Sequence, residues 1–451
     1  MDDVEKLRER IRSLEKENAS LRNSNHCAED EKKDESVHIN TSINHRSSSA
    51  YQGDLKSEHI ERYSRQLLLN GGFGVEGQLK LIKSSVLVVG AGGIGSTVIL
   101  YLAACGIGKI SIVDFDEVDV SNLHRQIIHK TNDVGMNKAE SARRAVENLN
   151  PSILCTVVKE PLTANNALEL ISSSDCVVDA SDNPQTRYLI NDACVLSEIP
   201  LVSGSAMGIE GQLTVYNYRG GPCYRCLYPK PNATEGNKSC AENGVLGPVP
   251  GLIGILQAVE TIKIITGIDD VLSDRLLMYD SLQCSFLRIK KPPRQTQCPV
   301  CGPEATITSI EESFGASQLA RGPSCCPMKN ERQAISNSLS ISCTEYDLIR
   351  DRGDLHILLD VRVKEQFDLC SLPGAINIPL TSIPKQIEQL STISNGTKPV
   401  YCICRRGIAS VIATNMIVEG IQKYPNIHSI INITGGYNSW RSNVDKSFPM
   451  Y

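Results

Sequence analysis

Two cysteine pairs have the spacing of metal ligands. Cys223 and Cys226 form one C-x₂-C pair, and Cys298 and Cys301 form the other, each beside glycine or proline residues that favour turns. Two such pairs can surround a Zn²⁺ ion with four thiolates at about 2.3 Å and leave no open coordination position. The pattern predicts a structural zinc site that ties the end of a domain to its middle. A chance pairing or a redox-active pair is the alternative.

A glycine-rich loop follows an apolar, β-branched run typical of a buried parallel strand. The loop spans residues 90–95 (GAGGIG) and precedes a helical pattern. Glycines at such a turn let the backbone approach a phosphate, whose charge the helix N-terminus attracts. Asp114 ends the next predicted strand, where a carboxylate can reach ribose hydroxyls. Alone, the loop fits an NAD-binding domain, another nucleotide site or a tight structural turn.

Three charged residues favour phosphoryl or nucleotidyl transfer over hydride transfer. Arg125 follows soon after Asp114, Lys138 opens a predicted helix, and Asp182 follows a predicted strand. Cations neutralise charge on phosphates, and a carboxylate can hold Mg²⁺. A hydride-transfer site needs none of these groups.

Two further cysteines could carry covalent chemistry. Cys404 follows a predicted strand and opens a loop with Arg405, Arg406 and Gly407, before a helix predicted to start at residue 410. Backbone N–H groups, the helix N-terminus and the arginines would stabilise a thiolate there. Cys402 competes for this role, but it lies inside the strand, where burial is expected, so we favour Cys404.

Cys240 lies in a polar, loop-like stretch. An exposed thiol there could act as a nucleophile, and a loop cysteine without chemistry is the alternative.

The elements that must position these groups predict two α/β domains. Runs at 86–89, 110–113, 176–179 and 200–202 predict strands of one mostly parallel sheet, and the run at 213–216 predicts the start of an antiparallel group. Residues 252–266 predict a helix. A Ser-, Gly- and Pro-rich linker at 303–340 separates this domain, 51–302, from a smaller one at 341–451, where 357–360 and 399–403 predict strands.

The N-terminal residues 1–50 contain a short a/d stripe at 4–21, which predicts either a short coiled coil or a frayed amphipathic helix, and then a polar, disordered linker. The chain of 451 residues has 17 cysteines and a net charge of −5. It shows no signal peptide, no run of 18 apolar residues and no basic stripe. We therefore expect a soluble cytosolic protein that contacts neither membrane nor nucleic acid directly.

Residues 61–301 resemble the adenylyltransferases of the ubiquitin-activating superfamily, a Rossmann-like (ThiF-type) fold. The resemblance rests on residues 62–66 (RYSRQ), the GAGGIG loop, 113–116 (VDFD), 121–126 (SNLHRQ), 135–138 (GMNK) and 179–183 (DASDN). It implies an ATP and Mg²⁺ site in which Gly93 contacts phosphates, Asp114 the ribose and Asp182 the metal. The implied ATP-binding set is Gly93, Asp114, Ser121, Asn122, Leu123, His124, Arg125, Lys138, Asp182 and Asn183, with Arg125 and Lys138 stabilising the transition state.

The same resemblance implies three further roles. Arg65 would reach the triphosphate bound by a neighbouring subunit, which implies a homodimer; without the resemblance it would be a solvated helix charge. The four paired cysteines match the family's zinc ligands. Cys240 matches a cysteine able to bond covalently with the carrier protein.

The C-terminal domain resembles a rhodanese domain through residues 359–362 (LDVR), 372–379 (LPGAINIP) and 435–440 (GGYNSW). The resemblance implies that Cys404 carries a persulfide. Ile408 and Ala409 stand where the nearest relatives usually have Asn-Asp, so two polar groups of the persulfide pocket are missing. Slower sulfur transfer or a different donor is the expected consequence.

The two domains together resemble the eukaryotic molybdenum cofactor synthesis protein 3 and ubiquitin-like protein activator 4 family, with plant members nearest. The resemblance implies adenylation of the C-terminal glycine of ubiquitin-fold carriers ending in Gly-Gly, then thiocarboxylate formation with sulfur from a cysteine desulfurase. The thiocarboxylate products would serve molybdenum cofactor synthesis and tRNA thiolation. Three rivals remain: an NAD dehydrogenase, a conjugating activator that needs Cys240 and not Cys404, and a C-terminal domain that only recruits partners.

Overall fold

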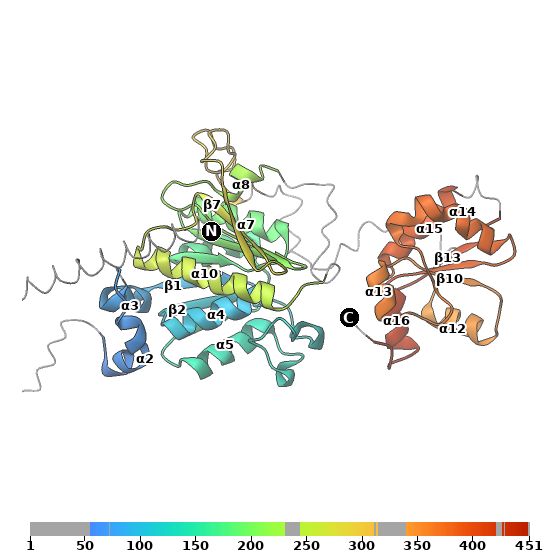
Figure 1. The fold of residues 1–451 in the computed structure, drawn as a ribbon, viewed down its shortest axis with the longest axis horizontal. Helices are drawn as coiled ribbons and strands as arrows, with labels where there is room; N and C mark the ends of the chain where they lie inside the picture. Colours follow the sequence, from blue (N-terminus) through green and yellow to red (C-terminus); the bar gives the residue numbers. More distant parts are fainter. Residues whose placement is uncertain are drawn as a thin grey trace, which may run out of the picture. The chain divides into compact units, whose positions relative to one another are not determined.

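The computed structural model describes residues 55–71, 73–230, 244–310, 313, 340–420, 426–427 and 429–449. Two open α/β sheets organise these residues, and each is described by itself (Figure 1). The predictions for residues 1–50 and for Cys240 lie outside the described residues.

The first sheet has eight strands in the order β3-β2-β1-β4-β5-β6-β7-β8. Strands β1 to β5 pair in parallel, and β6, β7 and β8 extend the sheet antiparallel from β5. The predicted parallel strands and the antiparallel group are confirmed. The strands are β1 Ser85–Val89, β2 Lys109–Val113, β3 Leu154–Val158, β4 Cys176–Asp179, β5 Leu201–Met207, β6 Glu210–Tyr216, β7 Arg275–Asp280 and β8 Ser285–Lys290.

Helices bury both faces of the parallel part of this sheet. Along β1, Val86 and Val88 belong to one hydrophobic cluster, and Leu87 and Val89 belong to the other. Because both faces are covered, residues 86–89 of the strand are all apolar and buried. The helices are α2 Ser57–Leu67, α3 Gly74–Lys83, α4 Gly93–Cys105, α5 Lys138–Leu149, α6 Ala164–Ser172, α7 Pro184–Leu196, α8 Tyr224–Leu227 and α10 Pro248–Thr266, with 3₁₀ turns η1 Val120–Asn122 and η2 Thr131–Asp133.

Helix α10 begins earlier than predicted, at Pro248, and packs against α4, β5 and β6 (Figure 1). By length and composition alone it is the one helix in the described residues that could cross a membrane. Half of its apolar window is buried inside the protein, and so are the polar side chains of Gln257 and Glu260. A Cβ on Gly254 would lie 2.2 Å from the Ile94 carbonyl oxygen, so glycine lets α10 approach α4 closely. The contacts are those of a core helix.

The second sheet has five strands, all parallel, in the order β11-β10-β12-β13-β9. They are β9 Ser340–Ile341, β10 Ile357–Asp360, β11 Ile376–Asn377, β12 Val400–Ile403 and β13 Ile430–Ile433. The helices are α12 Cys343–Asp351, α13 Lys364–Leu369, α14 Ile383–Ser394, α15 Ile408–Gly420 and α16 Gly436–Asn443, with the 3₁₀ turn η4 Leu380–Ser382. The central strand, β12, ends directly before Cys404.

The start of the predicted linker differs in the structure. Ile310 is fully buried in the core of the first domain, and Ser313 donates a hydrogen bond to Asp192 on α7. A few apolar residues scattered in a polar stretch (303–313, PEATITSIEES) show no sustained periodicity, so the composition alone could not place this segment in the domain.

Candidate functional site

The glycine loop joins β1 to α4, and its glycines are required by close contacts. Gly90 has a φ of +100°, and a Cβ there would lie 2.7 Å from the Ala180 carbonyl oxygen in the loop after β4. A Cβ on Gly95 would lie 2.0 Å from the Gly90 carbonyl oxygen. Gly92 is the N-cap of α4, and its nearest contact from a Cβ would be the Gln126 side chain at 3.8 Å. The loop backbone is therefore closely packed at Gly90 and Gly95, whereas there is space at Gly92, where the helix begins, as a phosphate site requires.

Asp114 lies at the end of β2, beside this loop. The Ala91 N–H donates to its Oδ2 at 2.8 Å, and the Asp116 N–H donates to its Oδ1 at 2.9 Å. Burial raises the pKa of Asp114, while Lys138 and the two N–H groups act in the opposite direction. The structure thus brings the predicted ribose residue against the predicted phosphate loop.

Lys138 is the first residue of α5, and it is buried. Its Nζ lies 2.9 Å from Asp116 Oδ2. Asn137 caps the helix and donates to the carbonyl oxygens of Asp114 and Asp116. Asp116 thus orients the predicted catalytic cation. This role of Asp116 was not predicted, because its partner Lys138 lies 22 residues further along the chain.

Residues 121–125 form one hydrogen-bonded turn. Asp119 caps η1 by accepting from the N–H and hydroxyl of Ser121. Arg125 donates to Asn122 Oδ1 at 2.8 Å and to the Ser121 carbonyl oxygen at 3.2 Å. His124 Nδ1 lies 3.0 Å from that same carbonyl, and the Leu123 N–H donates to the Val120 carbonyl. The turn orders five predicted ATP ligands as a unit.

Asp182 is exposed in the loop after β4, the strand next to β1. Because parallel strands end at the same edge, Asp182 and the glycine loop share that edge. Asn183 caps α7 by accepting from the Thr186 N–H at 2.7 Å. This contact gives Asn183 a structural role in addition to the predicted ligand role.

Asp179, at the end of β4, was not predicted as part of the site. It is fully buried and accepts from Arg187 Nε at 2.7 Å, from Ser203 at 2.8 Å and from Ser181. The Asp179–Arg187 ion pair and the hydrogen bond from Ser203 thus fix the end of β4, which leads into the loop that carries Asp182. Burial works against the charge of Arg187, but Asp179 outweighs it and raises the pKa of the guanidinium.

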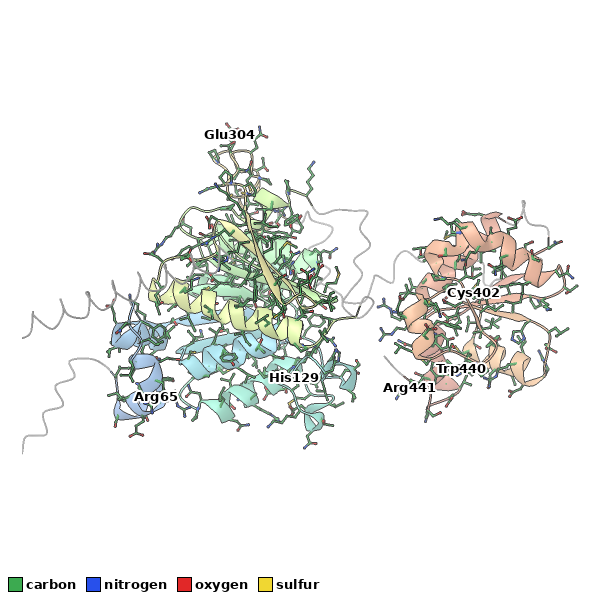
Figure 2. The ribbon with its side chains drawn as sticks, viewed as in Figure 1. Arg65, His129, Glu304, Cys402, Trp440 and Arg441 are labelled. Atoms are coloured by element: carbon green, nitrogen blue, oxygen red, sulfur yellow. The ribbon has the colours of Figure 1, made fainter. Side chains whose placement is uncertain are left out.

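Arg65 is exposed on α2 (Figure 2). The structure contains one chain, and among its described residues no hydrogen bond joins Arg65 to the glycine loop. Its action in a neighbouring subunit stays a prediction.

The four paired cysteines meet in one buried cluster. The Sγ atoms of Cys223 and Cys226 are 3.9 Å apart, those of Cys223 and Cys298 3.5 Å, and those of Cys226 and Cys301 3.4 Å. All four lie within 4.8 Å of one another. A tetrahedron with metal–sulfur bonds of about 2.3 Å has edges of about 3.8 Å, so the cluster could hold a metal ion.

Hydrogen bonds and an ion pair fix the two cysteine turns. The Gln295 N–H donates to Cys226 Sγ at 3.4 Å. Between the first two cysteines, Arg225 donates to both carboxylate oxygens of Asp192 at 2.8 and 3.0 Å, and both side chains are buried. Such contacts orient metal ligands from behind.

Cys404 lies at the end of β12, below the turn that leads into α15. Its Sγ accepts from the N–H groups of Gly407 at 3.1 Å and Ser410 at 3.3 Å, and it lies 3.3 Å from the Ser410 hydroxyl. Donors that point at a sulfur stabilise negative charge on it. The loop can therefore hold a thiolate or a persulfide.

The competing cysteine has a different environment. Cys402 is fully buried inside β12, and burial raises the pKa of its thiol to about 12. Figure 2 shows Cys402 within the second sheet. The structure thus places it as a core residue.

The segment after β13 holds the Cys404 loop from the other side. The Tyr437 N–H donates to the Cys404 carbonyl at 2.9 Å, and the Asn438 N–H donates to the Arg405 carbonyl at 3.0 Å. A Cβ on Gly436 would lie 1.9 Å from that Cys404 carbonyl oxygen, so only glycine fits. Ile408, the first residue of α15, is exposed, and the effect of Ile408 and Ala409 on sulfur transfer stays a prediction.

Two family descriptions match the chain. The ThiF family matches residues 63–300, and the rhodanese-like domain matches residues 342–443. "Adenylyltransferase and sulfurtransferase MOCS3" of Aedes aegypti is 44% identical over 406 residues, which cover 88% of this chain and 90% of that protein. The protein of the same description from Arabidopsis thaliana is 43% identical over 410 residues, covering 88% and 86%. Among solved structures, E. coli MccB has a TM-score of 0.48 at 24% identity, covering 56% of this chain and 74% of its own.

Proposed function

This chain belongs to the adenylyltransferase and sulfurtransferase MOCS3 family, with a ThiF domain followed by a rhodanese domain, and from this we propose how its two sites act in sequence. The enzyme uses ATP to activate ubiquitin-like sulfur carriers and then transfers sulfur to them. One observation supports the proposal most: a single chain combines a nucleotide loop flanked by Asp114 and Lys138 with a cysteine that receives two backbone N–H groups.

In the first stage, a carboxylate oxygen of the carrier's C-terminal glycine attacks the α-phosphorus of ATP. The bond to the β-phosphate oxygen breaks, and pyrophosphate and a carrier acyl-adenylate result. Arg125 and Lys138 stabilise the charge that develops on the phosphate, and Asp114 holds the ribose. Asp182 would hold the Mg²⁺, which neutralises phosphate charge when bound. In a homodimer, the partner subunit's Arg65 would contact the triphosphate.

In the second stage, the outer sulfur of a Cys404 persulfide, supplied by a cysteine desulfurase, attacks the activated carbonyl carbon. AMP leaves, and the carrier is held as an acyl persulfide. The Cys240 thiolate then attacks the Cys404 sulfur, the sulfur–sulfur bond to the carrier breaks, and the carrier leaves as a thiocarboxylate. A Cys240–Cys404 disulfide remains, which a cellular thiol reduces.

The remaining assignments complete the proposal. The four-cysteine cluster holds one structural zinc ion, since four thiolates and no open position suit Zn²⁺. The carriers are the molybdopterin synthase small subunit and the ubiquitin-related modifier, so the products serve molybdenum cofactor synthesis and tRNA wobble-uridine 2-thiolation. The reducing cytosol suits a chain whose working thiols must stay free.

Mass spectrometry of a Gly-Gly-ended carrier tests the proposal. The carrier is incubated with the enzyme, MgATP and a persulfide donor, and we expect one sulfur to replace one oxygen at its C-terminus. Lys138→Ala is expected to lower the rate of both adenylate and thiocarboxylate formation at least a hundredfold. Cys404→Ala is expected to abolish only the thiocarboxylate. Intact thiocarboxylate formation by Cys404→Ala would contradict the role of Cys404 as sulfur carrier, whereas a carrier adenylate or thioester without any thiocarboxylate in the wild type would favour a conjugating activator whose rhodanese domain is a binding module.

A further inference from the structure

His129 connects the nucleotide loop to the helix that carries Lys138. It lies in the segment after Arg125 and is buried, with 5% of its surface exposed (Figure 2). Its Nε2 lies 3.0 Å from the carbonyl oxygen of Ala91, which is in the middle of the glycine loop. Its Nδ1 lies 2.9 Å from the hydroxyl of Ser141, one turn into α5. The ring therefore bridges two parts of the ATP site that are far apart in sequence.

The partners determine which ring nitrogen carries the proton. A carbonyl oxygen only accepts, so Nε2 must donate to Ala91. Burial lowers the pKa of His129, with Lys138 acting in the same direction and the Ala91 contact and Asp133 opposing, so a neutral ring is favoured. In the neutral ring Nδ1 carries no proton, so the single proton of the Ser141 hydroxyl is shared between Nδ1 at 2.9 Å and Asp133 Oδ2 at 3.0 Å, to which that hydroxyl donates. Asp133 in turn accepts from the Lys130 N–H.

The Ala91 peptide is held at both ends by site residues. Its N–H donates to Asp114, and its carbonyl accepts from His129. Ala91 itself is fully buried, so no solvent replaces a lost donor. Gly90, Gly92 and Gly93 surround it and have more backbone freedom than other residues. The orientation of the loop N–H groups that face a phosphate therefore depends on these two hydrogen bonds.

We propose that His129 is a positioning residue for ATP, which holds the Ala91 carbonyl through Nε2–H and thereby keeps the glycine loop in register with Lys138. This inference rests on the proposed function, since the loop is taken to bind ATP phosphates. His129 touches neither substrate nor reacting atoms, and it acts through Ala91. The expected effect is on the affinity for ATP more than on the chemical step.

Two amide substitutions separate this role from general stability. In His129→Gln, the amide N–H reaches about as far as Nε2 and can still donate to Ala91. In His129→Asn, the shorter amide reaches only the position of Nδ1, so the contact with Ser141 is kept and the bond to Ala91 is lost. The two variants remove the same ring and are matched in polarity.

Carrier-dependent ATP–pyrophosphate exchange gives KM for ATP and kcat for each variant. We expect His129→Asn to raise KM for ATP about tenfold, as for the loss of one buried hydrogen bond, with less than a threefold change in kcat. His129→Gln should remain within threefold of wild type in both. Equal KM values for the two variants, or a fall in melting temperature without a change in KM, would overturn the proposal.

The test also separates this inference from the proposed function. If the wild-type protein shows no carrier-dependent exchange, the proposed function fails, and calorimetric titration of the full chain with MgATP still compares the variants. A tenfold weaker affinity of His129→Asn alone supports the role of His129. If His129→Asn does not fold, His129→Gln decides: a KM or Kd for MgATP within threefold of wild type supports the proposal, and a tenfold rise contradicts it.

Discussion

Cys402 and Cys404 are the same amino acid two positions apart, and their surroundings give them different chemistry. Cys402 is inside β12, where burial raises the pKa of its thiol to about 12 and disfavours the thiolate. Cys404 is just past the strand end, where the N–H groups of Gly407 and Ser410 point at its sulfur. Cys404 is itself buried, at 3% exposure, so the two N–H donors and not exposure distinguish it from Cys402.

Cys402→Ala is predicted to leave sulfur transfer within threefold of wild type, because the buried thiol takes no part in it. The truncation should lower the free energy of unfolding of the rhodanese domain by about 1–2 kcal/mol through the small cavity it leaves. Persulfide loading, measured by intact-protein mass spectrometry, and denaturant unfolding check the two parts. Loss of loading in Cys402→Ala with a folded domain would transfer the sulfur-carrying role to Cys402.

Residue types and spacing predicted where the main chemical groups lie, but they did not predict which residues hydrogen-bond to those groups. The CxxC pairs, the glycine loop and Cys404 were visible because few other arrangements explain such local patterns. Asp116, Asp179 and His129 were not singled out, because their contacts are with residues far along the chain or in loops. An aspartate or histidine in a loop carries no periodic signal that would show which distant atom it meets.

At the scale of elements, α5 positions Lys138 and carries its own network of charges. Glu140 accepts from Arg143 at 2.5 Å and lies 3.2 Å from Lys159 Nζ. The hydrogen bond from Arg143, supported by Lys159, lowers the pKa of Glu140 to about 2. Because this folded-state pKa is below the usual 4.5, the carboxylate stabilises the fold above about pH 4.5. The contribution is lost as the pH falls through about 2.

Glu140→Gln is therefore predicted to lower the free energy of unfolding at pH 7 by about 1 kcal/mol, since its partners are partly exposed. The deficit should shrink between pH 4.5 and pH 2, where the wild type also loses the charge. Thermal melting of both proteins followed by circular dichroism at pH 7, 4 and 3 checks this. A deficit that stays constant over that range would show that the charge of Glu140 contributes nothing.

The elements themselves were predictable where burial was complete. Strands β1, β2 and β4 are rich in β-branched apolar residues and almost completely buried, and each was predicted. Strands β3 and β8 lie at the two edges of the sheet, and β8 is exposed throughout. Neither was predicted, nor was β7 beside β8; these three strands are only partly buried or exposed, although residues 154–158 (LCTVV) of β3 are mostly apolar.

At the scale of the whole molecule, the two domains have separate cores, and a single tryptophan allows the unfolding of one of them to be followed. Trp440, the only tryptophan of the chain, is buried in the rhodanese domain, whereas the four-cysteine cluster is in the ThiF domain. Tryptophan fluorescence therefore follows one domain, and circular dichroism follows both.

Removal of zinc is predicted to destabilise only the ThiF domain. Treatment with a strong chelator should lower its melting temperature by 10 °C or more, on the order of several kcal/mol of lost metal binding. The Trp440 fluorescence transition should stay within about 2 °C. Metal analysis of the purified full chain should give one zinc per chain. Cys298→Ser is the matched variant, expected to show the same selective loss without chelator, and a parallel shift of the Trp440 transition would contradict a site confined to one domain.

The cysteine cluster also has a consequence for the order of events during synthesis. Cys223 and its partner Cys298 are 75 residues apart in sequence, and α10, β7 and β8 lie between them. At about 5–20 residues per second, the ribosome makes the second pair roughly 4–15 seconds after the first. The first pair alone offers an ion only half its ligands until Cys298 and Cys301 have been made, after α10, β7 and β8. Capture of a metal ion by all four cysteines would thus come late in the synthesis of the ThiF domain, shortly before Ile310, which is buried in the same core.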